Sequence, residues 1–203
     1  MNILRIVLTL VVLSPLSVQA SLIFKGNLNT AQVVSPPGTP LGATGLVSLT
    51  LNVAKTELTY SITLSDEVFL SLDPMFEPNT TGVTKIHFHS ASPGTTGPHV
   101  LNVFGLPGQD DDDLVINYAT NTISGIWGDP GDMLGDPTSP GSTKAFSGFV
   151  DELLMGGLYV AVHTVNAGGN VEIRGQINQV PEPFTLGLLS VGLLGLFVAR
   201  KRT

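Results

Sequence analysis

Apolar and polar residues alternate along much of the chain between residues 21 and 180. Over residues 47–53, and again over residues 58–64, every second residue is Val, Leu, Ile or Tyr and the residues between are Ser, Thr or Asn. A period of two is typical of a strand that buries one face. Because only the short segment 54–56 separates the two runs, the pattern predicts a β-hairpin.

Other segments show the same character, and most are bounded by Gly, Pro, Asn or Asp. The further predicted strands are 22–28, 83–89, 99–104, 114–118, 122–127, 145–149, 158–164 and 171–178. Short strands at this spacing predict an all-β fold, an antiparallel sandwich or barrel. Two segments depart from it: residues 151–155, followed by two glycines, predict one helical turn, and the Gly/Pro-rich residues 129–143 predict a long surface loop.

The first twenty residues have the order of parts of a secretory signal peptide. A short basic start ends at Arg5, residues 6–13 are apolar apart from Thr9, and Pro15 follows. Val18 and Ala20 are small residues at the two positions that a signal peptidase reads, which predicts cleavage between Ala20 and Ser21. The alternative is an uncleaved anchor, against which the short apolar run argues.

The C-terminus combines an apolar run with a basic end. Residues 184–199 are apolar or small and would rise about 24 Å as a helix, slightly less than a bilayer core. Residues 200–202 (Arg-Lys-Arg) belong on the cytoplasmic side of such a span. The pattern predicts a transmembrane helix and places the intervening domain, residues 21–179, outside the inner membrane. The simplest interpretation of this pattern is a tail anchor.

Three parts follow one another over residues 180–203: the motif Pro181, Glu182 and Pro183, the span 184–199, and the basic residues Arg200, Lys201 and Arg202. Together they resemble a PEP-CTERM sorting signal. In that family an exosortase, a membrane cysteine transpeptidase of Gram-negative bacteria that make extracellular polysaccharide, cleaves near the motif. The resemblance implies a membrane-tethered precursor that faces the periplasm and a product at the cell surface or outside the cell. The span is then a disposable sorting element.

The charge of the central domain excludes one class of partner. Between residues 21 and 180 there are five basic and fifteen acidic residues, and such a surface repels phosphate backbones, so no nucleic-acid binding is expected. The chain has no cysteine, which excludes disulfides, thiolate metal sites and a cysteine nucleophile. No catalytic motif, such as a nucleophile elbow, is present.

Four segments across the domain carry a second resemblance: Leu28–Val34, Thr44-Gly45, Ile86–His89 and a block from Gly157 to Ile177 that contains "GLYVAVHT" and "EIRGQI". They resemble the CHRD domain, a module named after chordin and widespread in exported bacterial proteins. The sequence departs from the family pattern at Val34, Ala161 and Val171. The resemblance implies an immunoglobulin-like or superoxide-dismutase-like Greek-key β-sandwich, and it brings no established general activity.

The four histidines of the chain are His87, His89, His99 and His163. His87 and His89 are two residues apart on a predicted strand, so they share a face with their Cβ atoms about 7 Å apart. Paired imidazoles at this spacing can hold one copper or zinc ion. His163 ends a separate predicted strand, and His99 follows a Gly/Pro-rich loop.

Copper/zinc superoxide dismutases show a similar order of histidines. This chain lacks their histidine-rich zinc loop, their cysteine pair and a clearly placed guiding arginine, which argues against superoxide dismutation. The alternative to a metal site is a structural role, because neutral imidazoles can hydrogen-bond across a sandwich edge. On the sequence alone the structural role is favoured, and the copper or zinc site stays open.

Two further groups of charged residues have plain interpretations. Asp110 to Asp113 are adjacent and do not follow EF-hand spacing, so a solvated turn is favoured over a calcium site. Glu172 and Arg174 alternate on the last predicted strand, where an ion pair of Arg174 at the sandwich edge is expected.

These features predict an exported, non-enzymatic structural or binding protein of the cell surface or the extracellular matrix. Its expected processing enzymes are signal peptidase and exosortase, and its expected partners are exopolysaccharide or another surface protein in a biofilm. The alternative is a periplasmic or extracellular copper- or zinc-binding protein that uses the four histidines. A hydrolase with an unrecognised site is a third, weaker interpretation.

Overall fold

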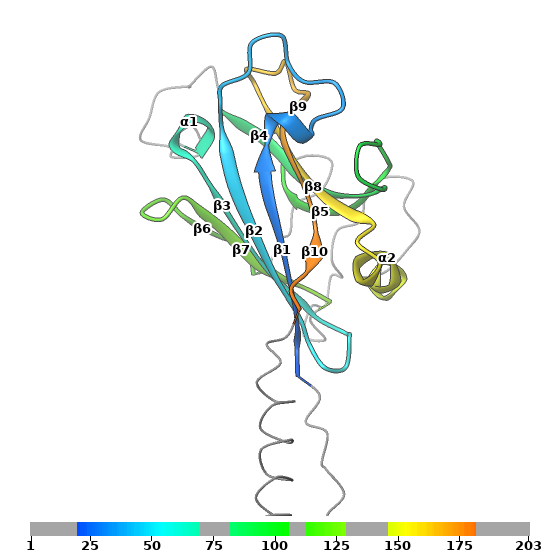
Figure 1. Ribbon diagram of the computed structural model, residues 1–203. Coiled ribbons are helices and arrows are strands. Elements are labelled where there is room, and N and C mark those ends of the chain that lie inside the picture. Colours follow the sequence, from blue (N-terminus) through cyan, green and yellow to red (C-terminus); the bar gives the residue numbers. More distant parts are fainter. Residues whose placement is uncertain (1–19, 70–81, 106–112, 129–145, 182–203) are drawn as a thin grey trace, which may run out of the picture.

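The computed structural model describes residues 20–69, 82–105, 113–128 and 146–181 (Figure 1). Within these ranges the chain forms strands joined by turns and short helices. The strands are β1 (Leu22–Asn29), β2 (Thr44–Leu51), β3 (Leu58–Leu64), β4 (Val83–Ser90), β5 (His99–Phe104), β6 (Val115–Asn117), β7 (Thr122–Trp127), β8 (Leu158–Thr164), β9 (Val171–Gln176) and β10 (Asn178–Gln179). The helical turns are η1 (Thr30–Gln32), α1 (Asp66–Phe69), η3 (Phe146–Gly148) and α2 (Val150–Leu154).

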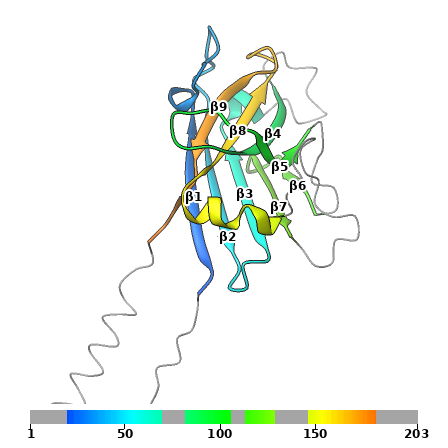
Figure 2. The same ribbon diagram turned by 90° about the vertical axis from the view of Figure 1, so that its right-hand side faces the viewer.

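All the strands belong to one antiparallel sheet, which curls strongly into a half-barrel (Figures 1 and 2). The strand order is β5-β4-β8-β9-β1-β2-β3-β7-β6, and β10 also pairs with β1. Strand β1 joins the two halves of this sheet. It pairs with β2 over all eight of its residues, but it meets β9 only where Asn29 faces Arg174, and its first half pairs with β10.

The prediction of an all-β antiparallel fold is confirmed. The predicted division into two separate sheets is not found among the described residues, because β9 and β10 both hydrogen-bond to β1 and connect the two halves along that edge. The predicted hairpin is also confirmed: β2 and β3 pair from Gly45–Leu64 to Leu51–Leu58. Strand β2 ends at Leu51, however, and Val53 lies exposed in the turn.

The predicted strand 145–149 is wrong, since residues 146–148 form η3 and lead into α2. Phe146, Phe149, Val150 and Leu153 are all buried in the core. Their spacing of i, i+3, i+4 and i+7 puts them on one face of a helix. Helix α2 confirms the predicted helical turn, and it lies across the open side of the curled sheet (Figure 2).

The two ends of the described chain lie side by side. The backbone N–H of Val180 donates to the carbonyl of Ile23 at 2.8 Å, so the strand that leaves toward the C-terminus runs beside the strand that enters from the N-terminus. The proposed transmembrane span 184–199, most of the signal peptide, the loop 129–143 and Asp110 to Asp112 lie outside the described residues. No helix within the described ranges is both long and apolar enough to cross a membrane.

Candidate metal centre

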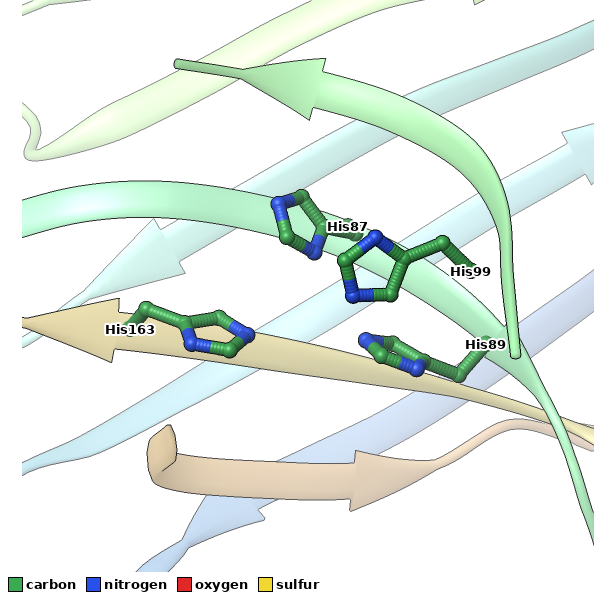
Figure 3. A group of neighbouring side chains, drawn as sticks. All are labelled: His87, His89, His99 and His163. Atoms are coloured by element: carbon green, nitrogen blue, oxygen red, sulfur yellow. The ribbon is translucent and has the colours of Figure 1, made fainter. Parts of the chain in front are cut away.

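Three neighbouring strands place the four histidines against one another (Figure 3). His87 and His89 lie on β4, His99 begins β5, and His163 lies near the end of β8. One ring nitrogen of each histidine lies within 4.8 Å of the corresponding nitrogen of every other. The ring centroids of His87 and His99 are 4.1 Å apart, and those of His87 and His163 are 4.9 Å apart. The structure therefore brings together all four residues that the sequence singled out.

The histidine cluster lies on the face of the sheet that points away from the main core. Ile86 and Phe88 belong to the core, so His87 and His89, which alternate with them, face the other way. That second face is nevertheless buried: His87 is 0% exposed and His89 is 6% exposed. His99 and His163 are only partly buried, so the cluster is closed at the β4 histidines and more open at the other two.

A β-bulge brings His99 into the cluster. Phe88 pairs with Leu101 and the next residue, His89, pairs with His99, so Val100 is an extra residue in β5. Such a bulge rotates the strand locally and changes the direction of the side chains beyond it. Without it, Val100 would stand opposite His89.

Backbone carbonyls fix the orientation of two of the rings. The Nδ1–H of His89 donates to the Gly97 carbonyl at 2.9 Å, and the Nδ1–H of His163 donates to the Gly169 carbonyl at 2.9 Å. Each ring then presents an unprotonated Nε2, and both of these nitrogens are buried without a hydrogen-bond partner among the described residues. A hydrogen bond from the far ring nitrogen is the usual support of a metal-binding histidine.

His87 makes no hydrogen bond with the described residues through either ring nitrogen, although it is fully buried. Its neighbour across the β4–β5 pair, Asn102, likewise has both polar atoms of its side chain buried without a partner. A buried polar group without a partner costs about 1–3 kcal/mol. A bound ligand or ordered water could supply the contacts that these groups lack within the protein.

The environment keeps the imidazoles neutral. Burial lowers the pKa of His87 to about 3, and the neighbouring His99, His163 and His89 add to that effect. Burial likewise lowers the pKa of His89 to about 4, against the opposing hydrogen bond to Gly97. The pKa values of His99 and His163 are also lowered, mainly by burial. Neutral imidazole is the form that binds a metal ion, because the ligating nitrogen must be free of a proton.

The ligand set and its spacing suit copper or zinc. A tetrahedral zinc ion bound at about 2.0–2.1 Å spaces its nitrogen ligands about 3.3 Å apart, and a tetragonal copper(II) ion places opposite nitrogens about 4.1 Å apart. The widest separation here, 4.8 Å, is close enough that small side-chain rotations would bring four nitrogens onto one ion. No carboxylate of the described residues belongs to the group.

Tyr159 and Arg174 pack in sequence against the His89 side of the cluster. The Tyr159 ring stacks on His89 with centroids 4.8 Å apart and planes at 13°, and the guanidinium carbon of Arg174 lies 3.6 Å from the centre of the Tyr159 ring. Arg174 also donates to the carbonyls of Ser92 and Thr95. The phenol oxygen of Tyr159 accepts from the N–H of Gly97 at 3.3 Å, so both residues hold the β4–β5 segment whose carbonyl orients His89.

The predicted ion pair of Arg174 is not found among the described residues. Its guanidinium donates to the two carbonyls and to the Gln176 amide oxygen. The Glu172 carboxylate accepts instead from the Leu41 N–H and from the side chains of Thr164 and Asn166. A β-bulge at Glu172, where Val162 pairs with Ile173 and His163 pairs with Val171, separates the two charges.

The carbonyls of Gly97 and Gly169 were not predicted from the sequence as partners of the histidines. Glycine itself was the signal at the first position: a Cβ atom on Gly97 would lie 1.9 Å from the Ser90 carbonyl oxygen, so only glycine allows that close approach. Lys85 was also missed, although it precedes His87 by two residues on the same face of the strand.

The predicted processing sites lie partly within the described residues. Ala20 and Ser21 are exposed just before β1, and Pro181 is exposed just after β10. Glu182, Pro183, Arg200, Lys201 and Arg202 lie outside the described residues. Asp113, from the acidic run, accepts a hydrogen bond from the Ile126 N–H through one carboxylate oxygen.

Known protein families match both the central domain and the C-terminal end of the chain. The family model of the CHRD domain matches residues 24–177, and that of the PEP-CTERM protein-sorting motif matches residues 179–202. No curated protein and no solved structure gives a significant match to the chain. Both resemblances noted in the sequence are thereby confirmed, and the sorting motif indicates an exported protein that is sorted to the cell surface by an exosortase.

Proposed function

The chain belongs to the CHRD domain family and ends in a PEP-CTERM motif, and from this premise we propose that it is an exported protein that binds one copper or zinc ion. The ligands are His87, His89, His99 and His163. The observation that carries the proposal is the convergence of buried, unprotonated ring nitrogens that have no hydrogen-bond partner among the described residues.

The geometry favours this function over structural packing, which the sequence alone favoured. A structural histidine uses its ring nitrogens in hydrogen bonds, yet His87 uses neither and the Nε2 atoms of His89 and His163 are unused. The Nδ1 atoms of the latter two are held by carbonyls. This arrangement directs the free nitrogens inward, where a metal ion would satisfy them.

Metal content and thermal stability test the proposal. The exported protein, purified from the periplasm, is expected to contain about one copper or zinc ion per molecule. Metal at a hundredfold excess over its Kd is expected to stabilise the stripped protein by about 2.7 kcal/mol, because it binds only the folded state. Absence of both metals, together with a melting temperature that added metal does not change, would contradict the proposal.

Variants separate metal binding from packing. His99→Ala is expected to weaken metal binding strongly while costing little stability, because His99 is only partly buried. Gln179→Ala, an exposed change on β10, is the control and should bind metal like the wild type. If the His87→Ala/His89→Ala variant retains the ion, these histidines are not ligands.

The sorting motif also supports a proposal about where the protein acts. The processed protein acts, on this proposal, as a non-enzymatic structural or binding component of the cell surface or of an exopolysaccharide matrix. Replacing residues 181–183 by alanines is expected to leave an unprocessed membrane form, seen by the C-terminal mass of the mature protein. Identical processing in this variant would refute exosortase cleavage at the motif.

A further inference from the structure

Two positive charges lie beside a cluster suited to a metal cation. The described part of the chain holds four cationic side chains, and two of them, Lys85 and Arg174, adjoin the histidines; the others are Lys25 and Lys55. Cations repel a metal ion, so their presence lowers its affinity. The chain has an excess of acidic residues, so it is unexpected that two of its few cations lie beside a cluster suited to a metal cation.

Lys85 lies at the open end of the cluster. It is the cross-strand neighbour of His163 in the β4–β8 pair and shares its face of β4 with His87. Its side chain is partly exposed and has no hydrogen bond or ion pair with the described residues. Its charge contributes to the lowered pKa values of His87, His99 and His163, which is consistent with this proximity.

Arg174 contributes its charge from the closed side. It is 3% exposed and stacks on Tyr159, which in turn stacks on His89. All its hydrogen bonds go to neutral acceptors, the carbonyls of Ser92 and Thr95 and the amide oxygen of Gln176. Its charge is therefore not compensated by a carboxylate of the described residues, and it is committed to the fold rather than free to bind a ligand.

A loaded centre would carry a large uncompensated charge. Four neutral imidazoles leave the charge of a divalent ion unchanged, and no carboxylate of the described residues belongs to the group. The two neighbouring cations add to that charge in a partly buried site, where electrostatic interactions are screened less than in water. An anion that reached the metal would be stabilised by all three positive groups.

We propose that the metal-loaded centre binds a small inorganic anion at its open side, between His99, His163 and the ammonium group of Lys85. The anion bonds to the metal, and Lys85 stabilises its negative charge. Copper(II) suits this role, because its tetragonal geometry leaves a weakly bound position for a further ligand. This inference rests on the proposed metal function, since the metal supplies the bond.

Azide binding to the copper(II)-loaded full-length chain tests the inference. Azide bound to copper(II) gives a charge-transfer absorption band, and its titration gives a Kd. Lys85→Met is expected to weaken azide binding about five- to tenfold, the effect of removing one nearby charge in a partly screened site. Lys55→Met, in the exposed β2–β3 turn, removes the same charge elsewhere and should leave the Kd unchanged.

A neutral ligand distinguishes charge from structure. Imidazole should bind the wild type and Lys85→Met with the same affinity, because it gains nothing from the ammonium group. If azide does not bind, if Lys85→Met binds it as tightly as the wild type, or if both ligands weaken equally, the inference is overturned. Copper content is measured on every sample, so a failure to bind copper, which would overturn the proposed function, is distinguished from a failure to bind the anion.

Discussion

The β2–β3 hairpin and the β4–β8 pair are antiparallel strand pairs of one sheet, but they bury their side chains in different ways. In the hairpin, Leu49 and Tyr60 point into the core, while Thr50 and Thr59 on the other face are exposed. In the β4–β8 pair both faces are buried: Phe88 and Val160 pack in the core, and His87 and Ala161 lie on the second face.

The difference comes from what covers the second face. Residues 91–98, between β4 and β5, are held over it by hydrogen bonds to Arg174, Gln176 and His89. The turn at Gly169 does the same for His163. The core face of the β4–β8 pair thus stabilises the fold by apolar burial, as the hairpin does. Its second face buries histidine side chains, which costs free energy that a bound ligand can offset.

The largest expected effect that separates the two regions is a pH dependence. The pKa values of His87 and His89 in the folded protein, about 3 and about 4, lie below 6.5, so the unfolded chain binds more protons below pH 6.5. Stability of the metal-free protein is therefore lost as the pH falls from 6.5 toward these values. Between pH 7 and pH 5 each residue costs about 2 kcal/mol, about 4 kcal/mol together.

Urea unfolding of the metal-free chain at both pH values measures this loss. His99 and His163, whose pKa values are also lowered, act in the same direction. A His87→Gln/His89→Gln variant should lose much less stability over the same interval. A wild type whose stability is equal at the two pH values would show that these imidazoles are not held neutral.

A change in the hairpin should affect stability and leave the metal site alone. Leu49→Ala is expected to cost about 3 kcal/mol, because it opens a cavity at a fully buried position. The loss should be the same at pH 7 and pH 5, and the metal affinity of the folded protein should be unchanged. Thr50→Ala, on the exposed face of the same strand, should cost less than about 0.5 kcal/mol. Altered metal binding in Leu49→Ala would mean that the two regions are coupled.

Arg174 lies between the two regions, on β9: it pairs with Asn29 of β1, the neighbour of β2, and it also holds the segment over the histidines. Arg174→Met keeps most of the side-chain volume but removes the hydrogen bonds to Ser92 and Thr95. We expect a loss of about 2 kcal/mol in stability, together with weaker metal binding. A competition assay with a metal indicator measures the second effect. Unchanged affinity would show that the segment orients itself without this residue.

At the histidine cluster, Tyr159→Phe is expected to cost less stability than Arg174→Met. The ring stack on His89 remains, but the hydroxyl that accepts from the Gly97 N–H is lost, at a cost of about 1 kcal/mol. Metal affinity should fall about tenfold, because loss of a group that supports a ligand typically has that effect. Equal affinity in the two proteins would limit the role of Tyr159 to packing.

The same contrast explains what the sequence could predict. The hairpin followed from its period of two, which one buried face imposes on Val47, Leu49 and Leu51. The face shared by His87 and His89 followed from the same rule. The approach of His99 did not, because it depends on the bulge at Val100, and the helical spacing of Phe146, Phe149 and Val150 was mistaken for a strand.

The length of strand β1 also separates the described chain ends from the histidine cluster. Leu22 lies at the end of the sheet where the chain enters and, beside it, leaves toward the sorting motif; Asn29, seven residues further, pairs with Arg174 behind the cluster. At about 3.3 Å per residue, β1 spans about 23 Å between these points. The histidine cluster therefore lies roughly 23 Å from the end of the sheet where the two described chain ends lie side by side, and processing at the predicted sites near those ends would occur far from the histidines.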